Sequence, residues 1–283
     1  MRQPGLILEI ACTDADFQRF RELIYQQVGI NLHEGKKELV KARLSKRIRE
    51  ICLTSFKDYY EYLKNGHDQD ELVAMVNAIS TNVTSFFRES DHFTFLKETL
   101  IPHLTLKKSK KHNNQLRLWS AGCSTGEEPY SIAMTVLDAL PDRNCWDIKI
   151  LATDVSTQVL DKAQCGLYEK DRVAGIHPNM LRTYFQRGSG QWQGYFRVKD
   201  TLQNIITFRY LNLMKPFPFN RLFDVIFCRN VMIYFDRSTQ ETLVNKYYQQ
   251  LGEDGHLFVG HSESLAGVTH SFKYVKPTIY SRQ

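Results

Sequence analysis

A run of small residues near the middle of the sequence is the first feature suited to chemistry. It reads Leu118-Trp-Ser-Ala-Gly-Cys-Ser-Thr-Gly-Glu-Glu-Pro-Tyr130 and leads into a helix-forming stretch. Small residues let a backbone approach a ligand, and a helix N-terminus follows. Glu127 and Glu128 stand where a phosphate binder needs positive charge, so the turn suits a ligand with hydroxyl groups or a cation. The alternative is a tight strand–helix turn whose acids interact with the helix dipole.

Polar residues also follow two apolar, strand-like segments farther along the chain. One segment ends at Asp154, about one β-α unit after the glycine turn, where an acid can accept both ribose hydroxyls of a nucleoside. The alternative is that Asp154 caps the next helix. The other segment runs into Arg229 and Asn230, with Tyr234 just beyond. Ligands lie at the carboxyl ends of strands in such sheets, so this cluster favours a binding site.

A third polar group precedes the strand-forming region. Asn82, Thr84 and Arg88 surround the apolar pair Phe86-Phe87. Taken alone, this segment also fits a linker that is capped by threonine and asparagine.

A basic helix is expected in the first 80 residues. Lys36, Arg43, Lys46 and Arg47 recur at helical spacing and are expected to project within one arc, with Arg49 to one side. Such a charge run is usually a solvated face, and the alternative is a recognition surface for an acidic partner.

The elements that position these residues change character along the chain. Helical spacing predicts four helices: one capped by Asp14 and ended by Gly29, one over about 34–51, one from Ser55 to Asn65-Gly66, and one capped by Asp68 with Glu71 in a capping box. From residue 115, strand-like runs alternate with helical segments, which predicts a parallel or mostly parallel sheet flanked by helices. The runs are Gln115 to Trp119, Ile148 to Thr153, Ile205 to Tyr210, Phe223 to Cys228 and Gly255 to Gly260. The glycine-rich stretch from Arg187 to Gly194, followed by Tyr195 to Val198, predicts a β insertion.

Composition excludes several classes of protein. The chain has 283 residues, 42% of them hydrophobic, and a net charge of +6, a mild basic bias that permits an acidic partner. No apolar run reaches the roughly 18 residues of a membrane span, and the N-terminus does not read as a signal peptide. The six cysteines are scattered without zinc spacing, so no metal site is expected.

Several long motifs, in order, resemble the CheR family, the chemotaxis receptor protein-glutamate O-methyltransferases that use S-adenosylmethionine. The matching runs are Thr81-Asn-Val-Thr-Ser-Phe-Phe-Arg88, Trp119-Ser-Ala-Gly-Cys-Ser-Thr-Gly-Glu-Glu-Pro-Tyr130, Ala152-Thr-Asp154, Asn212-Leu213, Phe227-Cys-Arg-Asn-Val-Met-Ile-Tyr-Phe-Asp236 and Gly260-His-Ser-Glu263. The resemblance implies an α/β fold class: an all-α N-terminal domain over 1–78, a linker over 79–92 that contributes to the cofactor site, and a class I, Rossmann-like methyltransferase domain over 93–283. A small antiparallel β subdomain is implied at about 187–210.

The resemblance also implies roles for individual residues. The implied cofactor-binding residues are Asn82, Thr84, Arg88, Glu128, Asp154, Asn212, Leu213, Arg229 and Asn230. Arg88 and Tyr234 are the candidates for orienting the reacting groups. Receptor recognition falls to Arg43, Lys46, Arg47 and Arg49. In the β subdomain, Gly188, Gly190 and Gly194 either tether a receptor C-terminal peptide or only form hairpin turns.

The implied reaction is methyl transfer to receptor glutamates, which yields methyl esters and S-adenosylhomocysteine without a metal. The implied setting is the bacterial cytoplasm, with a monomeric enzyme that acts on membrane-bound receptors and binds no nucleic acid. Two competing classes are a nucleic-acid methyltransferase and a noncatalytic cofactor-binding module. The first lacks an Asn/Asp-Pro-Pro-Tyr run, and none of the cysteines precedes a proline. The intact cofactor motifs weigh against the second.

Overall fold

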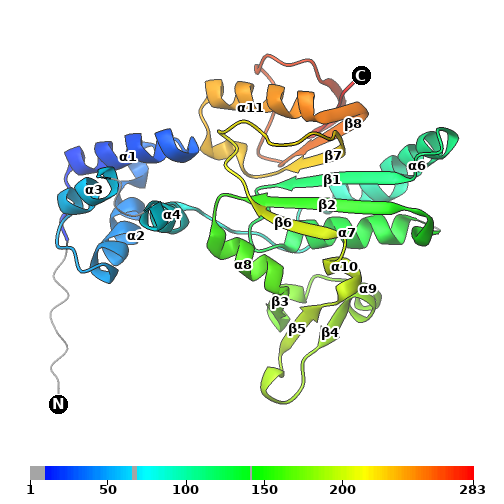
Figure 1. Ribbon diagram of the computed structural model, residues 1–283, viewed down its shortest axis with the longest axis horizontal. Helices are drawn as coiled ribbons and strands as arrows, with labels where there is room; N and C mark the ends of the chain where they lie inside the picture. The colour runs from blue at the N-terminus through cyan, green and yellow to red at the C-terminus, as the bar shows by residue number, and fades with distance from the viewer. Residues whose placement is uncertain (1–9, 66–68, 141) are drawn as a thin grey trace. The chain divides into compact units, whose positions relative to one another are not determined.

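The computed structural model describes residues 10–65, 69–140 and 142–283, and the chain divides into two compact units between Thr81 and Asn82 (Figure 1). The first unit contains the predicted helices. They are α1 (Asp14–Val28), α2 (Lys37–Glu50), which follows a short 3-10 turn, α3 (Phe56–Lys64) and α4 (Gln69–Ile79). No helix in the described part of the chain is both long enough and apolar enough to cross a membrane.

The ends of α1 and α3 follow from local side-chain chemistry. Thr13, not the expected Asp14, caps α1: its hydroxyl accepts the Asp16 amide at 3.1 Å, and the Asp16 carboxylate accepts the Thr13 amide at 3.1 Å. Gly29 ends α1 in the left-handed conformation, with φ +75°, as expected. The third helix begins at Ser55 as expected, and the Ser55 side chain caps α3 by accepting the Asp58 amide. The expected turn at Gly66 and cap at Asp68 lie outside the described residues.

The second unit contains a mixed seven-stranded sheet in the order β6-β2-β1-β7-β8-β10-β9. The first five strands in this order run parallel, and β10 and β9 pair antiparallel at one edge. The strands are β1 (Gln115–Ala121), β2 (Asp147–Asp154), β6 (Ile206–Tyr210), β7 (Phe223–Cys228), β8 (Leu251–Val259), β9 (Lys273–Lys276) and β10 (Ile279–Ser281). The expected mostly parallel sheet is confirmed.

Helices precede or connect the strands of this sheet. They are α5 (Ser90–Phe95), a π-helical turn (Leu96–Leu100), α6 (Ile101–Lys110), α7 (Glu127–Ala139), α8 (Thr157–Cys165), α9 (Pro178–Tyr184), α10 (Asp200–Gln203) and α11 (Arg237–Gln250). Among them, α7 packs on β1, β2 and β6, whereas α11 packs on β8.

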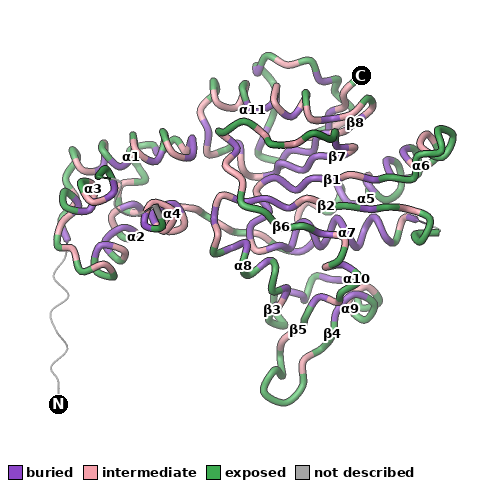
Figure 2. The backbone as a smooth tube through the Cα atoms, in the orientation of Figure 1, coloured by how far each residue is buried: buried purple, intermediate pink, exposed green. Residues whose placement is uncertain are grey.

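The central strands are buried along almost their whole length (Figure 2). Leu118, Trp119, Ile226 and Phe227 are fully buried. Near-continuous apolar strands are typical of a parallel sheet with both faces covered. The polar side chains available for binding a ligand therefore lie mainly where the strands end.

A second, three-stranded antiparallel sheet forms the β subdomain. Its strands are β3 (Leu167–Glu169), β4 (Phe185–Arg187) and β5 (Tyr195–Val198), in the order β3-β5-β4. The expected limits of about 187–210 are wrong at both ends. The subdomain begins with β3, which is too short to show alternation in the sequence, and Ile206–Tyr210 is instead an edge strand of the large sheet, paired in parallel with β2.

Candidate active site

The strand order gathers the polar segments at one edge of the large sheet. From β1 the chain moves to β2 and β6 on one side and later to β7 and β8 on the other, so the direction of winding changes between β1 and β7. Ligands bind at such a switch point, outside the carboxyl ends of the strands. Asp154 is the last residue of β2. The glycine turn, Asn212 and Arg229 follow the neighbouring strands β1, β6 and β7. The structure therefore brings together segments that are up to about a hundred residues apart.

The glycine turn is held tightly from two sides. The amides of Gly122 and Cys123 both donate to the Thr153 carbonyl, at 2.8 and 2.9 Å. Gly122 has φ +86°, and a Cβ there would lie 2.4 Å from Cγ2 of Val231, in the loop after β7. Only glycine fits this backbone conformation at this distance. The turn is therefore wedged between the end of β2 and the loop after β7.

Asp154 fixes the same turn through its carboxylate. Oδ2 accepts the Ser124 amide and Oδ1 accepts the Ser156 amide, each at 2.9 Å. The side chain is buried, and burial raises the pKa of Asp154 while these backbone amides oppose the rise. The alternative that Asp154 caps α8 is wrong, because Ser156 occupies that position. Each carboxylate oxygen keeps a lone pair, which can accept a ligand hydroxyl.

Glu128 and Arg229 form a buried ion pair beside the turn. Arg229 Nε donates to Glu128 Oε2 at 2.8 Å, and Ser120 Oγ donates to Glu128 Oε1 at 2.6 Å. The Arg229 side chain is 2% exposed, and its guanidinium lies 5.3 Å from the ring centre of Phe93. The structure therefore gives Arg229 a role in holding Glu128, in addition to the direct pocket role implied by resemblance.

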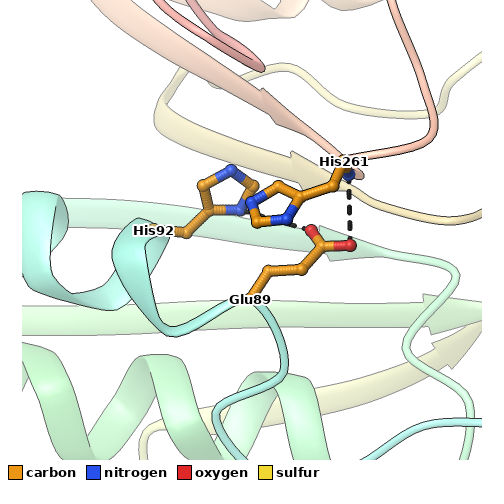
Figure 3. A group of neighbouring side chains, drawn as sticks. All are labelled: Glu89, His92 and His261. Atoms are coloured by element: carbon orange, nitrogen blue, oxygen red, sulfur yellow. Dashed lines mark hydrogen bonds and ion pairs between the residues drawn. The ribbon is translucent and has the colours of Figure 1, made fainter.

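Three further side chains, Glu89, His92 and His261, were missed by sequence reasoning and lie close together (Figure 3). Two of them, Glu89 and His92, contact Arg229. Arg229 Nη1 donates to His92 Nδ1 at 3.0 Å, so the hydrogen of this ring lies on Nε2 and points to Thr278 Oγ1 at 2.6 Å. Burial, with help from Arg229, lowers the pKa of His92 to about 4. His92 is therefore neutral at pH 7. Glu89 Oε2 lies 3.7 Å from Arg229 Nη1, and Glu89 Oε1 accepts the His261 amide at 3.1 Å.

The trio of Glu89, His92 and His261 also has the donor types of a metal site. Their ligand atoms lie within 4.8 Å of one another. However, His92 Nδ1 already accepts a hydrogen from Arg229, and a cation bound there would meet the guanidinium charge. The arrangement is therefore better explained as a support that fixes Arg229. The contact between His261 and Glu89 spans 172 positions, which no local sequence pattern reveals.

Segment 82–88 lies in the same unit as the glycine turn and contacts it. Ser124 Oγ donates to the Asn82 carbonyl at 3.0 Å, and the Phe87 amide donates to Ser131 Oγ at 3.0 Å. The Phe86 ring packs edge-on against Tyr168 of β3. The segment is thus anchored to the second unit and is not a free linker.

The polar side chains of this segment keep partial exposure. Thr84 and Arg88 are half-buried, and Arg88 Nη1 donates to the Val83 carbonyl at 2.9 Å.

Asn212 and Leu213 lie in a turn just after β6. Asn212 Oδ1 accepts the Met214 amide at 2.9 Å, and Leu213 is 9% exposed. Lys246 of α11 donates to the carbonyls of Leu213 and Lys215, both at 2.6 Å. Burial lowers the pKa of Lys246. Sequence reasoning also missed this lysine, which fixes the turn by binding two of its backbone carbonyls.

The loop after β7 carries Asn230 and Tyr234. Asn230 has φ +57°, a left-handed conformation that asparagine tolerates better than most residues. Tyr234 ends a short 3-10 helix (Met232–Tyr234) and is half-buried.

The structure separates the basic residues of α2 into two groups. Arg43 Nη1 donates to the carbonyls of Ile79 and Ser80, at 2.5 and 3.0 Å. Arg47 pairs with the buried Glu71, with Nε to Oε1 at 2.8 Å. These two arginines hold α2 against α4 and are not free to face a partner, contrary to the single exposed arc that was expected.

Lys46 and Arg49 are exposed, as is Lys36 before the helix. Lys46 is 77% exposed and makes only a loose contact with Glu50 at 3.9 Å. These cations are the ones available for recognition.

The glycines of the β subdomain serve its hairpin. The Gly188 amide donates to the Tyr195 carbonyl at 2.8 Å, and a Cβ on Gly188 would lie 2.1 Å from the Trp192 carbonyl oxygen. Gly190 and Gly194 have positive φ values of +59° and +91°. Turn formation accounts for all three glycines.

Comparisons with known proteins agree over both units. Residues 15–80 match the family described as "CheR methyltransferase, all-alpha domain", and residues 82–281 match "CheR methyltransferase, SAM binding domain". The chain is 40% identical to a chemotaxis protein methyltransferase of Borreliella burgdorferi, over 97% of this chain and 96% of that protein. It is similar to proteins of the same description from Escherichia coli, at 40% identity over 99% of this chain and 96% of that one, and Salmonella typhimurium, at 41% over 96% and 91%.

Proposed function

Since this chain belongs to the CheR methyltransferase family, we propose that it methylates glutamate side chains of membrane-bound chemotaxis receptors. It is an S-adenosylmethionine-dependent methyltransferase of chemotaxis. The observation that carries the proposal is the buried Asp154 carboxylate at the end of β2, hydrogen-bonded to the glycine turn after β1. That arrangement suits a ribose-bearing cofactor, because the Asp154 carboxylate is fixed by the Ser124 and Ser156 amides and can still accept hydrogen bonds from ribose hydroxyls.

We assign the cofactor pocket to the residues around this edge of the sheet. Asp154 holds the ribose, and Asn212 and Leu213 flank the adenine. Glu128, held by Arg229, and Asn230 complete the pocket. Asn82, Thr84 and Arg88 reach it from the segment that is anchored on the glycine turn. S-adenosylmethionine, when bound, supplies an activated methyl group.

Methyl transfer to a glutamate carboxylate needs no general base from the protein. A glutamate side chain has an ordinary pKa of about 4.3, so the substrate carboxylate is already ionised at pH 7. This agrees with a site in which Glu128 is paired with Arg229 and His92 is neutral and buried. Catalysis then rests on orientation and on exclusion of water. Arg88 and Tyr234 are the groups we assign to orientation.

We assign receptor recognition to the helical unit and methyl transfer to the second unit, in the bacterial cytoplasm. We further propose that the protein acts as a monomer. A receptor C-terminal peptide could add a strand to an edge of the small sheet, at β3 or β4. Titration with receptor tail peptides tests that tether.

One assay separates this function from methylation of nucleic acid. The protein is incubated with methyl-labelled S-adenosylmethionine and, in parallel, with receptor-containing membranes, RNA or DNA. We expect base-labile label in the receptor, as a methyl ester requires. Label in RNA or DNA, with none in the receptor, would replace the proposal with the alternative. Cofactor binding without transfer to any acceptor would indicate a binding module.

The exposed cations of α2 should steer the receptor. The double reversal Lys46→Glu/Arg49→Glu is expected to slow receptor methylation several-fold at low salt, because each exposed ion pair is worth under about 1 kcal/mol. Affinity for S-adenosylhomocysteine, measured by calorimetry, should not change. Raising the salt concentration should shrink the difference from wild type.

The matched control is Lys57→Glu/Lys64→Glu, two exposed lysines of α3 with the same charge change. It should methylate receptors as wild type does. Equal slowing by both pairs would mean that net charge alone acts and that α2 has no special role. Arg43 and Arg47 are unsuitable for this test, because reversing either removes bonds within the helical unit.

A further inference from the structure

Glu263, in the segment after β8, gathers an unusual number of backbone amides. Its Oε2 accepts the amides of Gly260 and Asn230, at 2.5 and 2.8 Å. Its Oε1 accepts three more, from Val231, Met232 and Ile233, at 2.9, 2.7 and 3.2 Å. Glu263 is 6% exposed. One buried carboxylate therefore binds the backbone of two loops.

The backbone of the loop after β7 is shaped to present these amides. Asn230 has φ +57°, whereas Val231 lies in the right-handed region, and successive residues of opposite hand turn their N–H groups toward one point. An anion at that point makes charge-assisted hydrogen bonds, which are stronger than neutral ones. Burial raises the pKa of Glu263, and the amides oppose the rise. The loop conformation and the carboxylate thus stabilise each other.

The loop after β7, whose amides Glu263 binds, contacts the glycine turn. A Cβ on Gly260 would lie 2.6 Å from Asn230 Nδ2 and 2.9 Å from Glu263 Oε2, so the two loops are in direct contact. On the other side, Val231 Cγ2 fills the space that a side chain on Gly122 would need. Tyr234 follows one residue after the last amide that Glu263 binds. Moving this loop would therefore disturb the glycine turn and Tyr234 together.

We propose that Glu263 is a positioning residue for methyl transfer, which holds the loop carrying Asn230 and Tyr234 against the glycine turn. The proposal rests on the function proposed above for this site. Glu263 acts through the backbone of residues 230–233 and through Gly260. The exposed carboxylates of this protein have no comparable set of backbone donors among the described residues.

The test is Glu263→Gln, which removes the charge and turns an NH2 group toward N–H donors. Amide hydrogen exchange at residues 230–233 is expected to quicken by about tenfold or more, while β7 (Phe223–Cys228) stays protected. At saturating cofactor, kcat with receptor membranes should fall by about tenfold or more, because a displaced orienting group costs turnover. Affinity for S-adenosylhomocysteine should fall as well.

Two further variants make the result interpretable. Glu253→Gln removes a carboxylate that is 74% exposed in β8, and it should match wild type in all three measurements. Gly260→Ala keeps the Glu263 charge but forces a Cβ between the two loops, and it should reproduce the quickened exchange and the loss of kcat. If the Glu263→Gln variant does not fold, amide hydrogen exchange and kcat of the Gly260→Ala variant test the proposal instead.

Quickened exchange at 230–233 with wild-type kcat and wild-type S-adenosylhomocysteine affinity would overturn the positioning role. Unchanged exchange at 230–233 would overturn it too. If the wild-type protein transfers no methyl group to receptors, the proposed function fails. Amide hydrogen exchange at residues 230–233 and affinity for S-adenosylhomocysteine would still test the positioning role of Glu263 separately.

Discussion

Arg229→Met is expected to abolish measurable methyl transfer and to lower the free energy of unfolding of the methyltransferase unit by about 3–5 kcal/mol. Methionine keeps much of the length of arginine but has no charge. The change would leave the Glu128 carboxylate buried without its cation. It would also remove the N–H group that donates a hydrogen bond to His92 Nδ1. The measurements are denaturant unfolding followed by a probe in the second unit, and label transfer to receptor membranes.

The control for this change is Arg221→Met, which removes an exposed arginine just before β7. It should leave unfolding and methyl transfer unchanged. Adding Glu128→Gln to Arg229→Met should restore part of the lost stability, because the unpaired buried charge is then gone, but not the methyl transfer. Equal unfolding of the Arg229→Met and Arg221→Met variants would contradict the role of a buried pair.

The parts of the fold that depend on local chemistry could be predicted from the sequence. The strand segments β1, β2 and β7 carry apolar residues at most of their buried positions, and Gly29 and Ser55 are residues that end or begin helices. Helical spacing also identified which basic residues share a face of α2. It could not show that α4 packs on part of that face, so Arg43 and Arg47 were wrongly expected to be free.

The candidate site was predicted most directly where its residues lie at the carboxyl ends of strands. Asp154, Arg229 and Asn230 were found in this way, because the carboxyl ends of parallel strands meet at one edge, whereas Asn212 was implied only by the family resemblance. His92 and Lys246 were missed. They lie on helices, act by holding other residues, and meet their partners only after the chain has folded. Such supporting contacts between distant segments leave no spacing pattern.

Asp154→Asn is expected to weaken binding of S-adenosylhomocysteine by about 10- to 150-fold, as calorimetry would measure it. The reason is that a charged acceptor for the ribose hydroxyls is worth about 1.5–3 kcal/mol, and each 1.4 kcal/mol is tenfold in Kd. The change also replaces one oxygen with an NH2 group, which cannot accept both the Ser124 and Ser156 amides as the carboxylate does. Asp161→Asn, an exposed change on α8, should leave the affinity unaltered.

The pH dependence of binding provides a second check on Asp154. Burial raises the pKa of this carboxyl, so on acidification Asp154 takes up its proton at a higher pH than an ordinary aspartate does. The protonated group has lost its charge and one acceptor site, so affinity for S-adenosylhomocysteine should fall as the pH drops through the raised pKa. In Asp154→Asn that fall should be absent, because nothing at this position titrates. The same acid-side fall in wild type and Asp154→Asn would assign it to another group and remove Asp154 from the ribose site.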